Sequence, residues 1–318
     1  MFAAGILVLS VGVLHVWANT LSVGGLLALM ILIWRVLTPI KILFSSQVRL
    51  KQISFSIGQI NSLLALAPER ETGAVAPVVA HLQGQVEFNK VSMRYGNEPT
   101  LALTNLNFVV KPGEVIAIVG RNGVGKTTLL KLLLGLYKPQ AGTILFDGVD
   151  SRQLDPIELR QAISYVPQIC QLFYGTVAQN LRLVSPLASD EMLRIAAEQA
   201  NVLQDILALP DGFNTRLHDQ DVNQCTASFL QRLSLARAYL KKSTLLLLDE
   251  PASTLDVASD TAFLKAIASF RTQSTIFMIT HRPSHMRIAD RIIWLQDGQI
   301  MMAGPTEQIW PHLPKEFK

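Results

Sequence analysis

The sequence predicts an α/β domain built on a largely parallel sheet and preceded by two membrane-spanning α-helices. Apolar residues are concentrated in two runs within the first 40 positions. From Val86 onward, short β-rich runs alternate with helical ones, which is the pattern of an α/β domain. A glycine-rich loop follows the continuous apolar run Val115–Val119 and leads into a leucine-rich helix, as expected after a strand buried on both faces.

The composition indicates that part of the chain lies in lipid. Charged residues make up 16% of the 318 residues, against about 25% in ordinary soluble domains, and 49% are hydrophobic. The apolar runs Phe2–Trp17 and Leu26–Ile40 are near or slightly under the roughly 20 residues that cross a bilayer as a helix. A secretory signal peptide is the alternative for the first run, although no positive region precedes it. Arg35, the one charge in these runs, is expected to line a helix bundle or to snorkel to the interface.

The two runs are expected to form a helical hairpin around the short turn Ala18–Gly25. Lys41, Arg49 and Lys51 follow the second run and place that end in the cytoplasm by the positive-inside rule. A helical apolar period continues through Leu66, so we expect the second helix to extend into the cytosol.

Three parts follow from these features. We expect a partial transmembrane domain at residues 1–66, a linker containing Pro and Gly at 67–82, and the α/β domain at 83–318. Cys170 and Cys225 fall in the α/β part, where reduced thiols are expected. The net charge of +4 says little about partners, and the chain has no basic run interleaved with aromatic residues, so nucleic acid is not an expected partner.

The strongest motif is GRNGVGKT at residues 120–127, which fits G-x-x-x-x-G-K-[ST] between a strand and a helix and predicts a P-loop NTPase. In such a loop, backbone N–H groups and the helix N-terminus bind phosphates. Lys126 is expected to reach the β/γ-phosphates, and Thr127 to give a hydroxyl to Mg²⁺. An ordinary glycine-rich turn is the alternative that this context disfavours. The residues expected to bind the nucleotide phosphates are Gly120, Arg121, Asn122, Gly123, Val124, Gly125, Lys126, Thr127 and Thr128.

Two further strands end in residues suited to phosphate chemistry. Leu245–Glu250 (LLLLDE) reads as a buried strand with carboxylates at its tip, where ligands bind in open α/β sheets. Asp249 is expected to hold Mg²⁺ and Glu250 to polarise the attacking water. His281 follows the apolar run Thr275–Thr280 and is expected to contact the γ-phosphate. For Asp249 and Glu250 the alternative is a solvated turn, and for His281 it is a polar residue at a strand end whose hydrogen bonds are satisfied locally.

Two other candidates are less specific. Gln168 follows the apolar run Ile163–Val166, and its amide is expected to reach the metal or the water. Tyr95 precedes the P-loop by the length of a hairpin and is expected to stack on an adenine, although an ordinary sheet aromatic is nearly as good an interpretation.

Taken in chain order, these motifs resemble the nucleotide-binding domain of ABC transporters over residues 83–318. The resemblance implies an ABC-type domain with a helical subdomain, and ATP with Mg²⁺ as cofactors. It implies that Tyr95 is the adenine-stacking residue, Gln168 the Q-loop glutamine, Asp256 the D-loop aspartate and His281 the switch histidine. The apolar helices resemble the last membrane helices of an exporter half-transporter, in particular of type I secretion and peptide exporters. The motifs that carry the resemblance are Tyr95, the P-loop, Gln168, QRLSLARA at 231–238, LLLLDE at 245–250, STLD at 253–256 and His281.

One motif departs from the family pattern. In ABC transporters the helix QRLSLARA follows Leu-Ser-Gly-Gly-Gln, the signature that closes on the γ-phosphate held by the opposite subunit. Thr226 keeps a hydroxyl, but Ala227 and Ser228 add side chains where bare backbone should approach the phosphate, and Phe229 removes an amide. The segment Leu217–Asn223 also lacks the usual glycines. A variant but working signature is the alternative, because Thr226 and the helix dipole remain. The residues in the five signature positions are Cys225, Thr226, Ala227, Ser228 and Phe229.

The resemblance predicts an ATP-hydrolysing subunit of an ABC exporter in the cell (inner) membrane, multi-pass, with its nucleotide-binding domain in the cytoplasm. A heterodimer with a second ABC subunit is favoured over a homodimer, because a homodimer would carry the degenerate signature in both sites. Two helices cannot enclose a transport path, so further transmembrane helices are expected from another chain or from a missing N-terminal part. The alternative is a catalytically weak, membrane-anchored regulatory or truncated ABC subunit. A soluble ABC ATPase is disfavoured by the hairpin.

Overall fold

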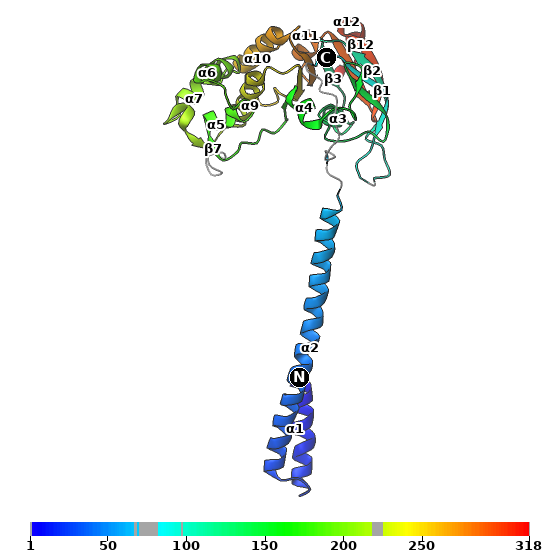
Figure 1. The fold of residues 1–318 in the computed structure, drawn as a ribbon, viewed down its shortest axis with the longest axis vertical. Helices are drawn as coiled ribbons and strands as arrows, with labels where there is room; N and C mark the ends of the chain where they lie inside the picture. The colour runs from blue at the N-terminus through cyan, green and yellow to red at the C-terminus, as the bar shows by residue number, and fades with distance from the viewer. Residues whose placement is uncertain (1, 67–68, 70–81, 97, 218–224, 318) are drawn as a thin grey trace. The chain divides into compact units, whose positions relative to one another are not determined.

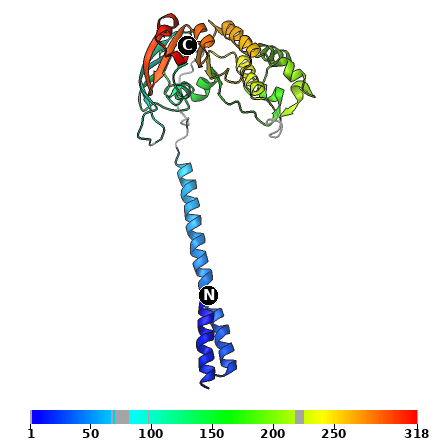
Figure 2. The same ribbon diagram turned by 180° about the vertical axis from the view of Figure 1, so that it is seen from behind.

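The N-terminal apolar residues form two antiparallel helices that run side by side, α1 (Phe2–Trp17) and α2 (Val23–Leu64) (Figure 2). Ser22 caps α2, because its hydroxyl accepts a hydrogen bond from the backbone N–H of Gly25 at 3.1 Å. As the apolar period predicted, the second apolar run continues beyond Ile40 as one helix of 42 residues. Among the described residues, α2 is the one helix long and apolar enough to cross a membrane, and α1 is a shorter apolar helix.

The structure is a computed structural model that describes residues 2–66, 69, 82–96, 98–217 and 225–317. The chain divides into two compact units, Met1–Glu69 and Arg70–Lys318, each of which is considered by itself. Nearly all of the predicted linker at 67–82, and residues 218–223 of the glycine-poor segment before the signature, lie outside the described residues.

The second unit contains the predicted parallel sheet. All neighbouring strands in it are parallel except the edge pair β11 and β12. From one edge to the other, its strands are β12 (Gln299–Pro305), β11 (Arg291–Gln296), β3 (Val115–Val119), β10 (Thr275–Ile279), β9 (Leu245–Asp249) and β6 (Ile163–Val166).

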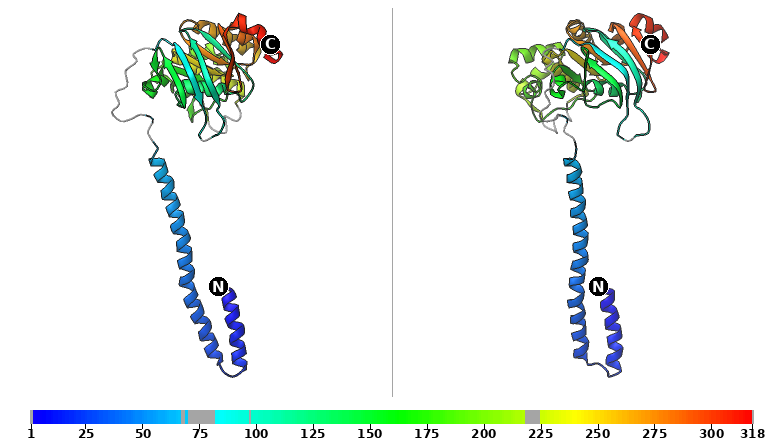
Figure 3. Two further views of the ribbon diagram at one scale, coloured as in Figure 1. Left: turned by 90° about the vertical axis from the view of Figure 1, so that its right-hand side faces the viewer. Right: turned by 45° about the vertical axis from the view of Figure 1, so that its right-hand side comes forward.

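A separate antiparallel sheet, which the sequence pattern did not predict, includes the first strands of this unit (Figure 3). In order across the sheet, its strands are β2 (Leu103–Val110), β1 (Val86–Met93), β4 (Ala141–Phe146) and β5 (Val149–Asp150). A two-stranded ribbon joins β7 (Gly175–Thr176) and β8 (Arg216–Leu217).

The described helices of the second unit fall into two groups (Figure 1). Those between β7 and β9 gather apart from the antiparallel sheet and form the helical subdomain, namely α5 (Val177–Arg182), α6 (Asp190–Gln199), α7 (Leu203–Leu207) and α9 (Ala227–Lys241), with the 3-10 turn η1 (Gly212–Asn214). The others are α3 (Lys126–Leu133), α4 (Pro156–Gln161), α10 (Val257–Phe270), α11 (Pro283–Ile288) and α12 (Thr306–Ile309), with η2 (Trp310–His312) and η3 (Lys315–Phe317).

The central strands are buried on both faces, as the continuous apolar runs predicted. In β3, Val115, Ala117 and Val119 belong to one apolar core, while Ile116 and Ile118 belong to the other. The first core includes residues of α5, α6, α9 and α10, and the second includes residues of α3 and the antiparallel sheet. Because successive side chains of a strand point to opposite faces, an unbroken apolar run fits this two-sided burial.

Candidate active site

Four predicted site segments follow neighbouring parallel strands. The P-loop follows β3, His281 follows β10, Asp249 ends β9 with Glu250 directly after it, and Gln168 follows β6. Because β3, β10, β9 and β6 are adjacent and parallel, their carboxyl ends lie at one edge of the sheet. Ligands bind at this edge in open α/β sheets, so the topology alone brings these segments together.

Glycines shape the P-loop. Gly125 has φ of 99°, and a Cβ there would lie 2.6 Å from the backbone oxygen of Ala102. A Cβ at Gly120 would lie 2.4 Å from the oxygen of Leu295. Both positions therefore require glycine on steric grounds. The chain then enters α3 at Lys126, and the first N–H groups of this helix have no partner within it, so they remain available to a phosphate.

The ammonium group of Lys126 is bonded to its own loop. Its Nζ donates to the carbonyl oxygens of Gly120 at 2.7 Å and Arg121 at 2.9 Å, and the side chain is buried. Burial lowers the pKa of Lys126, and the carboxylates of Glu250 and Asp249 oppose this shift. A phosphate that enters the loop would therefore compete with these two carbonyl groups for the ammonium.

Oxygen donors meet at the tip of β9. Thr127 Oγ1 donates to Asp249 Oδ2 at 2.9 Å, and the hydroxyl of Tyr165 contacts the same oxygen at 3.4 Å. Burial raises the pKa of Asp249, while the hydrogen bonds from Thr127 and Tyr165 lower it. A hydroxyl and a carboxylate suit Mg²⁺, which takes few protein ligands besides water and phosphate. In the described part of the chain, no group of three or more His, Cys, Asp and Glu residues is placed to hold a metal ion.

The three predicted catalytic residues form one hydrogen-bonded group. Gln168 Nε2 donates to Glu250 Oε2 at 2.9 Å, and His281 Nε2 lies 3.1 Å from Glu250 Oε1. Glu250 has φ of 48°, a left-handed conformation that L-residues rarely adopt and that often marks functional positions. Gln168 thus contacts Glu250, and its expected contact with the metal stays a prediction.

Tyr95 lies beside the P-loop. Its hydroxyl and Thr128 Oγ1 are 2.9 Å apart, and its ring packs edge-on against Tyr137 with centroids 5.0 Å apart. A pocket of about 530 Å³, within the size range of small-molecule sites, is lined by Tyr95, the P-loop and the Asp297–Gly298 turn. Both interpretations of Tyr95 remain compatible with these contacts, so adenine stacking stays a prediction.

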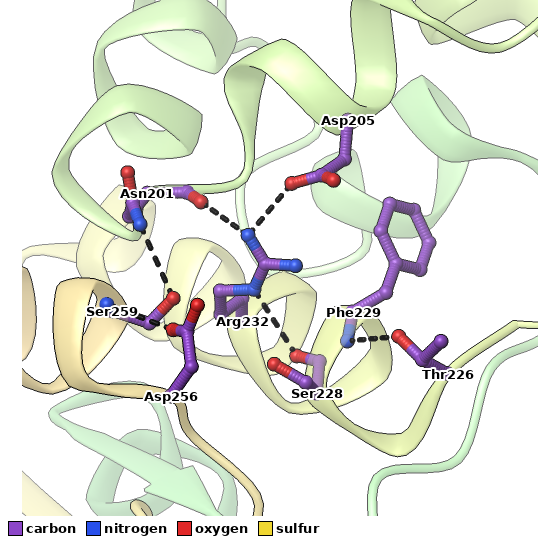
Figure 4. A network of polar contacts seen from close by, with 8 residues as sticks. All are labelled: Asn201, Asp205, Thr226, Ser228, Phe229, Arg232, Asp256 and Ser259. Atoms are coloured by element: carbon purple, nitrogen blue, oxygen red, sulfur yellow. Dashed lines mark hydrogen bonds and ion pairs between the residues drawn. The ribbon is translucent and has the colours of Figure 1, made fainter.

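The predicted signature positions lie at the start of α9, from the residue before its N-cap into its first turn (Figure 4). Thr226 is the N-cap, and its hydroxyl oxygen accepts from the N–H of Phe229 at 3.2 Å, which leaves the hydroxyl hydrogen available to a phosphate. Ala227 is exposed and Ser228 is half-buried at the tip of the helix, whereas Phe229 is buried in the core. Cys225 is partly buried against the same core. The signature positions therefore present a regular helix start that carries side chains.

A polar network ties this turn to the start of α10 (Figure 4). Arg232 donates to Asn201 O at 2.6 Å and to Ser228 O at 3.4 Å. Asn201 in turn donates to Ser259 Oγ at 3.1 Å. Asp256, the predicted D-loop residue, caps α10 by accepting from the N–H of Ser259 at 3.0 Å. Hydrogen bonds from Ser259 lower the pKa of Asp256, and the charge of Arg232 adds to the effect.

Three residues that the sequence did not single out touch the site. Tyr165 contacts Asp249, as described above. Its position in β6, three residues before Gln168, is the sequence feature that could have placed it near the site. Arg282 follows His281, the predicted switch histidine, and donates to Leu255 O, next to the predicted D-loop residue Asp256, at 3.1 Å. Phe317 stacks on His281 from a segment that is distant in sequence, and no local pattern signals that contact.

Comparisons with known proteins agree with this arrangement. The family model described as ABC transporter matches residues 103–253. An ATP-dependent lipid A-core flippase of Thiobacillus denitrificans is 35% identical over 90% of this chain and 49% of its own length. The alpha-hemolysin translocation ATP-binding protein HlyB of Escherichia coli O157:H7 is 32% identical over 94% of this chain and 43% of its own.

The fold also matches a solved structure. A bacterial Atm1-family ABC exporter with ATP bound superposes with a TM-score of 0.76 at 27% identity, over 93% of this chain and 52% of that one. The chain thus spans about half the length of the curated relatives that it matches.

Proposed function

Because this chain belongs to the ABC transporter family and carries an ABC transporter ATPase domain, we propose that it is the ATP-hydrolysing part of an ABC exporter. The observation that carries the proposal is the position of Glu250. Its carboxylate is bonded to Gln168 and His281, one residue after the Thr127–Asp249 pair at the edge where the P-loop opens. ATP with Mg²⁺ is the proposed substrate complex.

The position of each site residue indicates the group that it would bind. The N–H groups at the start of α3 and the ammonium of Lys126 bind the phosphates, and Thr127 with Asp249 would hold Mg²⁺. Bound Mg²⁺ supplies positive charge that offsets the charge on the transferring phosphoryl group. Each carboxylate oxygen of Glu250 has one hydrogen-bond contact in the structure and keeps a further lone pair that can accept a hydrogen bond or a proton from water.

The two faces of the domain are unequal. The P-loop face has the full set of predicted groups, whereas the signature face carries side chains at Ala227 and Ser228. An added Cβ keeps another backbone from a close approach, so this signature should serve a neighbouring P-loop poorly. We propose a partner subunit with an intact signature, in a heterodimer rather than a homodimer.

The membrane part supports export rather than a soluble role. The helix α2 is long and apolar enough to span, and Lys41, Arg49 and Lys51 follow its apolar segment. We propose a multi-pass location in the cell (inner) membrane with the ATPase domain in the cytoplasm, completed by transmembrane helices from another chain or from residues outside this sequence. Protein or peptide export is the favoured substrate class, from the resemblance to secretion exporters, although other relatives are named for lipid A-core and for β-(1→2)-glucan.

The test is the variant Glu250→Gln, which keeps the size of the side chain and removes its charge. With MgATP and a partner that has an intact signature, this variant should accumulate as an ATP-bound dimer, measured by light scattering after gel filtration. Lys126→Ala is the control, since it should lose nucleotide and remain monomeric. A Glu250→Gln chain that stays monomeric would count against the proposal.

A second candidate is a membrane-anchored regulatory or truncated ABC subunit with little turnover. The burial of Phe229 in the core and the side chains at 227 and 228 favour it. The intact group around Glu250 opposes it, because a subunit that only binds ATP has no need of that group. Hydrolysis by this chain beside a partner with an intact signature separates the two candidates.

A further inference from the structure

The last described residues of the chain fold onto the candidate active site. After α12, Leu313 and Phe317 are 3% and 4% exposed, and both belong to the core on the helical side of the sheet. The ring of Phe317 is stacked on the imidazole of His281, with centroids 6.0 Å apart and planes 20° apart. The segment Leu313–Phe317 is called the C-terminal strap below.

The neighbouring residue of the strap contacts the P-loop. Glu316 accepts from Arg121 Nε at 3.1 Å and from Nη2 at 3.5 Å, in a two-pronged ion pair. The Arg121 carbonyl is one of the two oxygens that hold Lys126. The ion pair is largely exposed, so it contributes little to holding the strap, and the burial of Phe317 is the stronger anchor.

Stacking is a suitable way to orient an imidazole. The ring makes its hydrogen bonds through nitrogens at its edge, in the ring plane. A parallel aromatic ring covers one face, restricts rotation about the Cβ–Cγ bond and leaves both nitrogens available. In this structure His281 Nε2 lies 3.1 Å from Glu250 Oε1, while the ring of Phe317 is stacked against the imidazole with centroids 6.0 Å apart.

We propose that Phe317 is a positioning residue for His281, so that the C-terminal strap sets the orientation of the switch histidine. The inference rests on the proposed hydrolysis of ATP. It assigns a role to the strap that the nucleotide-binding motifs do not contain. The strap touches the P-loop through Glu316 and the histidine through Phe317, so two adjacent residues join the two sides of the site.

The test uses the full chain beside a partner subunit with an intact signature, and compares it with the variant Phe317→Leu, which keeps apolar bulk but has no aromatic face. Phe317→Tyr keeps the face and should restore the wild-type result. Phe263→Leu is the matched control, because Phe263 also stacks on a histidine, His285, with centroids 5.0 Å apart outside the nucleotide site. The measurements are kcat for MgATP hydrolysis, the affinity for MgATP, and the NMR chemical shift of the His281 Cε1 proton in histidine-labelled protein.

In Phe317→Leu we expect kcat to fall about tenfold with nucleotide affinity nearly unchanged, since a 1 Å misplacement of a catalytic group can cost about 10²-fold. The ring-current shift of His281 should disappear in the same variant and return in Phe317→Tyr. An equal loss of kcat in Phe263→Leu, or an unchanged His281 shift in Phe317→Leu, would overturn the proposal. If the wild-type chain binds ATP without hydrolysing it even beside a partner with an intact signature, the proposed function fails, and the His281 shift alone then decides whether Phe317 orients that ring.

Discussion

Removing the two side chains at the tip of α9 should turn a poor signature into a working one. The perturbation is the double variant Ala227→Gly, Ser228→Gly. These residues occupy the first two positions of α9, whose N–H groups have no partner within the helix. Phe229 stays in place, because it is buried and its burial contributes about 1.5–3 kcal/mol.

The two substitutions should lower the free energy of unfolding only modestly, because both lie at the start of α9. Glycine in a helix interior costs about 1 kcal/mol relative to Ala, so two glycines at the helix start cost at most about 2 kcal/mol. At about 2–4 °C per kcal/mol for a domain of this size, Tm should fall by about 4–8 °C or less. The expected gain is in turnover, because a single backbone or side-chain donor to a transition-state oxyanion contributes about 10²–10³ in rate. We expect ATP turnover by the full chain to rise at least about tenfold.

The assay is phosphate release by the full chain in detergent as a function of protein concentration. The matched control is Ala268→Gly, Ser269→Gly, the same pair of residue types, which is exposed in the last turn of α10. It should lower Tm similarly and leave turnover unchanged. Unchanged turnover in the signature variant, or an equal rise in the control, would refute the steric explanation.

Three further predictions follow from contacts in the second unit. Tyr165→Phe removes the 3.4 Å contact to Asp249 and should raise the half-saturating Mg²⁺ concentration about two- to threefold, the low end of what a hydrogen bond contributes; a titration with no shift contradicts the contact. Gly125→Ala should lose nucleotide binding, measured with a fluorescent ATP analogue, because its Cβ would lie 2.6 Å from a backbone oxygen; wild-type affinity would disprove this. Burial lowers the pKa of His285, so on acidification the unfolded chain takes up this proton at a higher pH than the folded chain, and the free energy of unfolding should fall as the pH drops below about 6.5. In His285→Gln, whose amide can still donate to Asp260, Tm should therefore depend less on pH between pH 7 and 5. A Tm profile as steep as that of the wild type would contradict this.

The parallel sheet and the phosphate loop could be predicted because each has a local cause. The apolar runs at 115–119 and 245–248 alternate between two cores, so they had to be apolar at every position. Glycine at 120 and 125 is required by close backbone approach, which makes the motif visible in sequence. Both features are confirmed by the structure.

Other features have no local cause. The antiparallel sheet pairs β1 with β4 across about 50 residues, and its strands carry no turn signal that reveals this partner. The contacts of Tyr165 and Phe317 are set by the sheet and by the last described turn, so no local sequence pattern reveals them. Membrane crossing by α1 also stays a prediction, because that helix has 16 residues and only α2 among the described helices has the length and composition to span.

The unequal faces of the domain are tested most directly by mixing two forms of the chain. One is the wild type, and the other carries Ala227→Gly, Ser228→Gly and Glu250→Gln, so that it offers a signature without side chains but cannot hydrolyse ATP itself. The mixture should release phosphate at least about tenfold faster than either form alone, because only the wild-type P-loop facing the repaired signature is complete. A mixture no faster than the sum of its separate components would contradict the account.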